Sequence, residues 1–225
     1  MNDNVNEKGL VETLDVPEKE VPAKVKKQAA AAPSAEKKRA SVPVRILAEG
    51  GICVALAVAL SYLKIPVALN FGGFGGSIDL VMIPLIIFAM RSNAGWGMGA
   101  GLVFGILKFF FANGTAVDWV SIVFDYGVAY AMVGLAGLFR KNYRLLPVAA
   151  LTGCLARFAI HFLSGITVYA KYLPESFMGI EKPSLWLYSL LYNGTYMLPN
   201  TILAVVICSL LVVPPEQMGS PKAKK

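Results

Sequence analysis

Apolar residues occupy most of this chain in long stretches, with short polar segments between them. A helix that crosses a bilayer needs about 20 mainly apolar residues. Six stretches come near that length, at about residues 44–63, 78–90, 95–111, 117–139, 145–170 and 184–213. Because the connecting segments leave no room for a second soluble domain, the pattern predicts an all-α integral membrane protein. We expect a compact bundle of six transmembrane helices within residues 43–214.

The two ends of the chain have a different composition. Residues 1–42 are polar, rich in Ala, Lys, Glu and Pro, and contain no apolar run that would act as a signal peptide. They predict a disordered polar tail. A dispensable extension is the favoured interpretation, and a regulatory or lipid-surface role stays open. Residues 215–225 predict a short basic tail.

The positions of Lys and Arg predict how the bundle is oriented, because cytoplasmic loops carry an excess of both. One side of the predicted bundle collects the N-terminal tail, Arg91, the segment 140–144 and the C-terminal tail. The other side collects Lys64, Lys108 and the mixed segment 171–182. The first side is the more basic, so we expect both termini in the cytoplasm.

The overall composition supports a membrane location and argues against several classes of function. Hydrophobic residues make up 56% of the chain and charged residues 16%, where a soluble domain has about a quarter charged. The net charge is +7, but the basic residues lie between apolar runs, which argues against a nucleic-acid partner. No Walker, His-Glu-x-x-His or Gly-x-Ser-x-Gly motif is present, and the three cysteines lie singly in apolar runs. We therefore expect no catalytic residues, metal site or cofactor.

A set of polar and aromatic side chains falls inside the predicted spans. An ionisable residue at the centre of a span costs about 2.5–3.5 kcal/mol on insertion scales, so it suggests a function. With the predicted orientation, every member of the set lies in the outer half of its helix. The set comprises Asp125 and Tyr126 in the fourth span, His161 and Tyr169 in the fifth, and Tyr188 and Asn193 in the sixth. It predicts a polar, aromatic pocket that opens to the outside.

These residue types suit a flat, cationic ligand. The Asp125 carboxylate can pair with a positive charge, and aromatic rings attract a cation through their faces. The carboxamide of Asn193 can bind a ring amine and a ring nitrogen together. Gly165, on the same helix face as His161, is expected to leave a gap for a ligand ring.

Plainer interpretations of the same residues stay open. Asp125 could pair with Arg157 to neutralise both within the bundle, and His161 could make an ordinary hydrogen bond between helices. Tyr169 could be an anchor at the membrane interface. In a membrane enzyme, Asp125 and His161 would instead form an acid–base pair, and in a scaffold these polar groups would serve stability alone.

Small residues mark places where helices can approach closely. Glycine repeats every four residues across 97–105, and Gly51 and Ala55 are spaced in the same way on the first span. Packing within the bundle explains both, and a docking face for a partner is the alternative. The glycine-rich segment 72–76 is either a tight connector or a lid over the pocket, and it lacks the Gly-Lys-Ser/Thr of a phosphate loop.

Across about residues 44–213 the chain resembles the thiamine-specific substrate-binding (S) components of energy-coupling factor (ECF) transporters. The segments that carry the resemblance are Phe124–Tyr126 with Gly134–Phe139, His161–Gly165 and Leu187–Gly194. The resemblance implies high-affinity capture of thiamine from outside a bacterial cell, at the plasma membrane. It also implies that the thiamine pocket is lined by Asp125, Tyr126, His161, Tyr169, Tyr188 and Asn193.

The resemblance further implies partners. A membrane coupling subunit would dock on Gly51 and Ala55, and two separate ATPase subunits would hydrolyse ATP, so this chain would not be an enzyme. The chain departs from the family in its first outer loop, where Phe74 or Gly75 stands at about the place of a tryptophan; these two are the possible lid residues. An S component for another vitamin or a thiamine precursor is the nearest rival.

Overall fold

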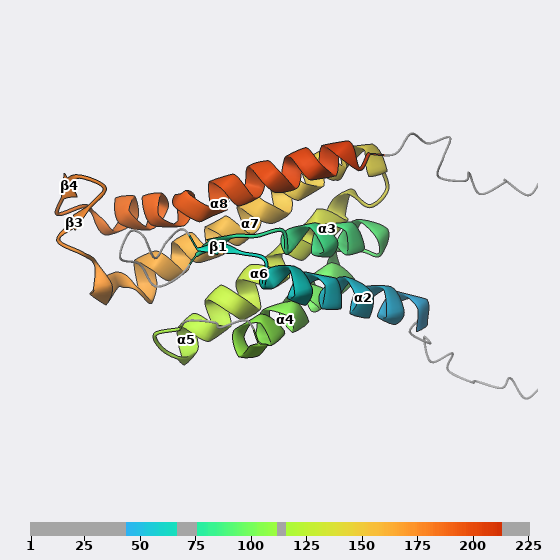
Figure 1. Cartoon of the computed structure of the whole chain (residues 1–225), viewed down its shortest axis with the longest axis horizontal. Coiled ribbons are helices and arrows are strands. Elements are labelled where there is room, and N and C mark those ends of the chain that lie inside the picture. The colour runs from blue at the N-terminus through green and yellow to red at the C-terminus, as the bar shows by residue number, and fades with distance from the viewer. Residues whose placement is uncertain (1–43, 67–75, 112–115, 213–225) are drawn as a thin grey trace, which may run out of the picture. The chain divides into compact units, whose positions relative to one another are not determined.

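A computed structural model describes residues 44–66, 76–111 and 116–212 of the chain. Within these ranges the chain is mainly helical, with two short hairpins between helices (Figure 1). The predictions for the tails at 1–42 and 215–225 lie outside the described residues. So do the possible lid residues Phe74 and Gly75.

Five helical stretches in the described ranges are long and apolar enough to cross a membrane, in agreement with five of the predicted spans. They are Val44–Ser61 (α2), Ala94–Phe111 (α4), Trp119–Phe139, Tyr143–Thr167 and Leu185–Leu210 (α8). The fourth of these consists of η4 (Tyr143–Leu145) and α7 (Leu146–Thr167). The helices α7 and α8 pack against each other along their lengths (Figure 1).

The second predicted span is shorter than expected. Its helix, α3 (Met82–Arg91), has 10 residues and is therefore about 15 Å long, half the apolar thickness of a bilayer. The residues before it form strand β2 (Ser77–Ile78), which pairs with β1 (Ile65–Pro66). Most of α3 is buried within the protein, so its apolar sequence reflects protein packing as much as contact with lipid.

The stretch Trp119–Phe139 is not one regular α-helix. It passes through α5 (Trp119–Ser121), the π-helix η2 (Ile122–Val128), α6 (Ala129–Val133) and the 3₁₀ helix η3 (Gly134–Phe139). Asp118 caps its start, because its carboxylate accepts the backbone N–H of Ser121 at 2.8 Å. π-helical turns are rare and often occur at functional sites, and this one contains both Asp125 and Tyr126.

The two sets of small residues differ in their surroundings. On α4, a Cβ added at Gly101 or Gly105 would collide with the carbonyl oxygen of Tyr130 or Tyr126, so these glycines allow the fourth span to pack closely. On α2, Gly51 and Ala55 are exposed, and a Cβ at Gly51 would meet nothing within 4 Å in the described part of the chain. Packing within the bundle therefore explains the α4 repeat but not Gly51.

One residue that the sequence analysis counted among the charges on the outer side of the bundle is instead part of the buried structure. Lys108 is only 8% exposed, and its Nζ lies 2.8 Å from the Asp79 carboxylate. The backbone N–H of Asp79 donates to Oδ1 of Asn200 on α8, and Nδ2 of Asn200 donates to the carbonyl of Ser77. Lys108 therefore neutralises a buried acid, and it gives no information about orientation.

Candidate functional site

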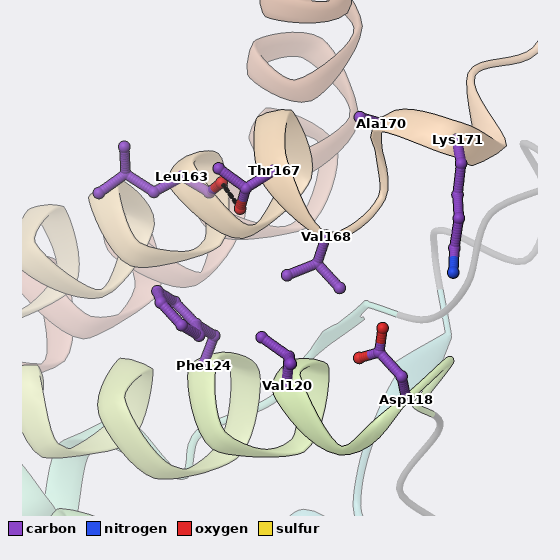
Figure 2. Close-up of a pocket in the computed structure, with 8 residues that line it drawn as sticks. All are labelled: Asp118, Val120, Phe124, Leu163, Thr167, Val168, Ala170 and Lys171. Carbon is purple, nitrogen blue, oxygen red and sulfur yellow. Dashed lines mark hydrogen bonds between the residues drawn. The ribbon is translucent and has the colours of Figure 1, made fainter.

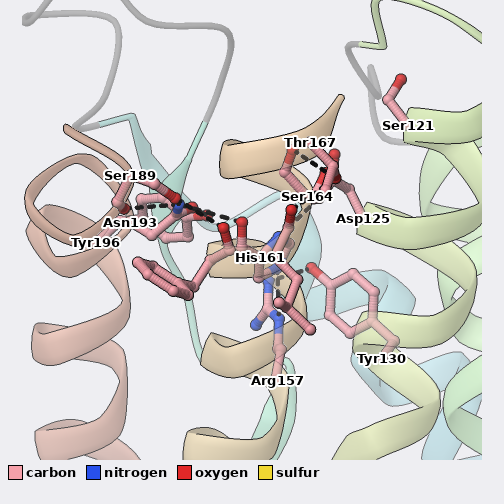
Figure 3. Close-up of polar contacts among 12 residues, drawn as sticks. Ser121, Asp125, Tyr130, Arg157, His161, Ser164, Thr167, Ser189, Asn193 and Tyr196 are labelled. Carbon is pink, nitrogen blue, oxygen red and sulfur yellow. Dashed lines mark hydrogen bonds and ion pairs between the residues drawn. The ribbon is translucent and has the colours of Figure 1, made fainter. Parts of the chain in front are cut away.

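The centre of the predicted site is a contact between the fourth span and α7. Nδ1 of His161 lies 3.0 Å from Oδ1 of Asp125 (Figure 3). Both side chains are largely buried, with 9% and 14% of their surfaces exposed. A carboxylate in this position needs a partner, because burying an unpaired charge is costly.

Arg157 fixes the protonation state of His161. Nε of Arg157 donates to Nε2 of His161 at 3.3 Å, and its Nη2 donates to the Tyr130 hydroxyl at 2.9 Å. Because arginine can only donate, Nε2 must accept, so a neutral imidazole carries its proton on Nδ1 and donates it to Asp125. Among the described residues the Asp125 carboxylate contacts His161, and no ion pair within 4.0 Å joins it to Arg157. The alternative pairing of Asp125 with Arg157 is not formed.

Asn193, on α8, lies on the other side of His161. Its Nδ2 donates to the His161 carbonyl at 3.3 Å and to the Ser189 carbonyl at 2.9 Å, and its Oδ1 accepts the Tyr196 hydroxyl at 2.6 Å. Both ends of the carboxamide are thus bonded within the protein. A ligand would have to exchange with these contacts to reach Asn193.

The expectation that Gly165 leaves room for a ligand ring is wrong. A Cβ at this position would collide with the side-chain oxygen of Ser189 and would lie 3.4 Å from Nδ2 of Asn193. The missing side chain is therefore used for the close approach of α7 and α8. This approach brings Asn193 into hydrogen-bonding distance of the His161 carbonyl.

Tyr188 belongs to an aromatic cluster that extends along α8 towards His161. Its ring stacks on Tyr192 with centroids 5.7 Å apart, Tyr192 contacts Tyr196 at 6.2 Å, and Tyr196 meets the His161 ring edge-on at 5.9 Å. Phe177 lies edge-on to Tyr188 at 4.9 Å. Sequence reasoning missed Tyr192, Tyr196 and Phe177, although tyrosines at i, i+4 and i+8 are a detectable signal for one helix face.

Tyr169 and Tyr126 lie at the opposite end of the site. Tyr169 follows the end of α7, and its phenol is within hydrogen-bonding reach of Ser121 and Asp125. Burial, reinforced by the Asp125 carboxylate, raises the pKa of the Tyr169 phenol, so it remains a donor at neutral pH. The Tyr126 ring packs edge-on against Phe109 of α4, with centroids 5.2 Å apart.

Two buried polar atoms near His161 make no hydrogen bond within the described structure. They are Nη1 of Arg157 and the hydroxyl of Ser164. Buried polar groups in native proteins nearly always have partners. Because both residues share the buried face of α7 with His161, a polar ligand in this region would find a donor at each.

Comparison with known proteins identifies the family. The model described as thiamine transporter protein (Thia_YuaJ) matches residues 47–219. The chain belongs to the thiamine transporter family. It is 32% identical over 163 residues to the thiamine transporter ThiT of Bacillus subtilis (strain 168), covering 66% of this chain and 82% of that protein.

Two further family members support the assignment. The thiamine transporter ThiT of Lacticaseibacillus paracasei is 27% identical over 194 residues, which cover 77% of this chain and 89% of that one. A solved structure of ThiT from Listeria monocytogenes superposes with a TM-score of 0.64 at 23% identity, over 75% of this chain and 93% of that chain. At this identity the superposition establishes a shared fold.

As a member of a thiamine transporter family with several apolar helices, the chain is a multi-pass membrane protein and not an enzyme. Membership removes support for an acid–base role of Asp125 and His161. Membership also confirms the resemblance of the sequence to thiamine-specific transport proteins. No group of three or more His, Cys, Asp or Glu that could hold a metal occurs in the ranges the structure describes.

In this member of the thiamine transporter family, some of the predicted thiamine-binding residues are in direct contact and others are further apart. Direct contacts join Asp125 to His161 and His161 to Asn193, and Tyr169 lies beside Asp125. Tyr188 is linked to them through a chain of ring contacts with Tyr192 and Tyr196.

Proposed function

We propose that this chain captures thiamine from outside the cell with high affinity, as the substrate-specificity subunit of an uptake transporter. The observation that carries the proposal is the Asp125 carboxylate, held by a neutral histidine among tyrosine rings. Thiamine combines a cationic thiazolium ring with a flat aminopyrimidine, so it needs a counter-charge and aromatic surfaces together. The named relatives are thiamine transporters, which supports the same substrate here.

In the proposed complex each residue has a separate role. The thiazolium ring lies near Asp125, whose Oδ1 is already fixed by His161. Asn193 binds the aminopyrimidine edge after exchanging its bond with Tyr196. Tyr126, Tyr169 and Tyr188 supply aromatic surface. Arg157 acts on the site indirectly, because it holds His161 in the tautomer that leaves Asp125 charged.

Calorimetric titration of the purified, detergent-solubilised protein with thiamine tests this function. We expect tight binding with one thiamine per chain. The same titration with other vitamins and with the separate aminopyrimidine precursor should give weaker binding. No heat with thiamine, from protein that unfolds cooperatively, would contradict the proposal, and tighter binding of another vitamin would assign the site to that compound instead.

We further propose that the chain works with a membrane coupling subunit and two ATPase subunits of an ECF module, with both of its termini in the cytoplasm of a bacterial cell. No ATP-binding motif occurs in the sequence, so the energy for uptake must come from elsewhere. Gly51 and Ala55 are exposed on α2, and small residues on an exposed face let a second helix approach closely. They are therefore the proposed docking surface.

Replacing Gly51 by tryptophan should abolish thiamine uptake by cells while leaving thiamine binding by the purified protein unchanged. The added side chain meets nothing within 4 Å of its Cβ in the described part of the chain, so the fold should tolerate it. Val206→Trp, at an exposed apolar position of α8, is the matched control and should keep both activities. Normal uptake by the Gly51 variant would exclude this docking surface.

A further inference from the structure

A cavity that contains none of the predicted thiamine-binding residues lies between the start of the fourth span and the end of α7. Its volume is about 670 Å³. Its walls are mainly apolar, formed by Val120 and Phe124 on one side and by Leu163 and Val168 on the other (Figure 2). We call this space the α5–α7 groove.

The α5–α7 groove faces the membrane rather than the interior of the bundle. Leu163, on its wall, is 44% exposed, and the neighbouring residues Trp119 and Val123 are also exposed. Both flanking elements belong to stretches long and apolar enough to span the bilayer. Exposed apolar side chains on such stretches are in contact with lipid tails.

Two opposite charges lie at one end of the groove. The Asp118 carboxylate and the Lys171 side chain point into the same gap from opposite sides (Figure 2). They are not among the ion pairs within 4.0 Å that join described residues. Asp118 is held in place because its Oδ1 accepts the Ser121 N–H, and Nζ of Lys171 lies 5.1 Å from the Tyr172 ring.

The position of these charges matches the layout of a lipid. Asp118 precedes the first residue of its spanning stretch, and Lys171 follows the last residue of the other. Both therefore lie where lipid headgroups begin, while the apolar walls extend towards the tails. Charged residues at the ends of spans reach the interface in this way.

We propose that the α5–α7 groove binds a phospholipid whose headgroup carries both a phosphate and an ammonium. The phosphate pairs with Lys171, the ammonium pairs with Asp118, and one acyl chain lies against the apolar walls. A lipid with a phosphate alone would leave the Asp118 carboxylate facing an anion. The two protein charges therefore select a zwitterionic headgroup over an anionic one.

The test uses the full-length protein in nanodiscs and native mass spectrometry. Discs contain equal amounts of phosphatidylethanolamine and phosphatidylglycerol, and the lipids that stay bound after release are counted. We expect phosphatidylethanolamine to be retained about fivefold over phosphatidylglycerol, the effect of about one charge contact at a membrane surface. The double change Asp118→Asn with Lys171→Gln should remove this preference.

Matched control variants distinguish lipid binding in the groove from general effects of altered charge or side-chain size. Glu181→Gln with Lys182→Gln removes one charge of each sign from the exposed hairpin strand β4 (Ile180–Glu181) and its next residue, and it should keep the preference. Thr167→Trp fills the groove and should remove it, while Leu155→Trp, elsewhere on the exposed side of α7, should not. If Asp118→Asn prevents folding, Lys171→Gln and Thr167→Trp still test the site.

Three results would overturn the proposal. The first is equal retention of the two lipids by the wild-type protein, and the second is an unchanged preference in both Lys171→Gln and Thr167→Trp. The third is release of the retained lipid by thiamine in equimolar amounts, which would assign the groove to the substrate. Thiamine titration of the same variants keeps the outcome separate from the proposed function, because none of the changed residues belongs to the predicted thiamine site.

Discussion

Replacing Asp125 by asparagine should weaken thiamine binding about 10- to 100-fold, because hydrogen bonds and contacts with a charged group contribute about 1.5–3 kcal/mol. Asparagine has the same shape and can still accept the proton of His161 Nδ1, which lies 3.0 Å from Oδ1 in the native protein. The substitution therefore removes the negative charge and little else. Calorimetric titration of the purified variant with thiamine measures the loss.

The charge effect can be separated from a general disturbance of the site by changing the ligand. The isolated aminopyrimidine half of thiamine has no thiazolium cation, so its affinity should be nearly the same for wild type and Asp125→Asn. Glu181→Gln, which removes an exposed carboxylate on β4, is the control for net charge and should bind thiamine normally. Equal weakening for both ligands would show that Asp125 maintains the structure of the pocket and does not pair with the cation.

The helices were predictable because lipid imposes a simple rule on sequence, namely long apolar runs with basic residues in between. The same rule misjudged α3 and Lys108. An apolar run that is buried in protein, such as Met82–Arg91, has the composition of a span whatever its length. Lys108 lies near the end of an apolar run, where lysines usually face the aqueous side. Its burial could not be predicted, because its partner Asp79 lies 29 positions away in the sequence.

The contacts at the centre of the candidate site were more predictable than those at its edges. Asp125, His161 and Asn193 stood out because polar groups in apolar spans are rare, and contacts do link them. The π-helix that carries Asp125 and Tyr126 has no simple sequence signal, so the orientation of Tyr126 towards Phe109 could not be foreseen. The prediction that Gly165 leaves space for a ligand was wrong, because a glycine allows the close approach of a neighbouring helix as readily as that of a ligand.

The aromatic surroundings show the same limitation. Phe177 comes from strand β3 (Ser176–Phe177) of a hairpin before α8, and it is the buried member of that strand. Nothing in its local sequence distinguishes it from other loop residues. Its position against Tyr188, near the start of α8, depends on the turn at Met178 and Gly179, which both have positive φ.

Replacing Lys108 by methionine should destabilise the protein by about 3–5 kcal/mol, because it leaves Asp79 buried without its counter-charge. Lys108 and Asp79 are in contact at 2.8 Å with 10% and 1% of their side chains exposed. Asp79 also holds the start of α3 to α8 through Asn200. The free energy of unfolding, measured in mixed micelles with increasing SDS, gives the effect.

A second substitution decides whether the loss comes from charge or from packing. Asp79→Asn added to Lys108→Met removes both charges and keeps an oxygen that can accept the Val81 N–H, as Asp79 does at 3.4 Å, so it should restore most of the lost stability. Arg45→Met breaks the exposed ion pair between Arg45 and Glu49, in which the arginine side chain is 80% exposed. This control should change the free energy of unfolding far less than Lys108→Met does. If the double variant is as unstable as Lys108→Met alone, the lysine stabilises the bundle through its contacts with Phe104 and Tyr130 and not by neutralising Asp79.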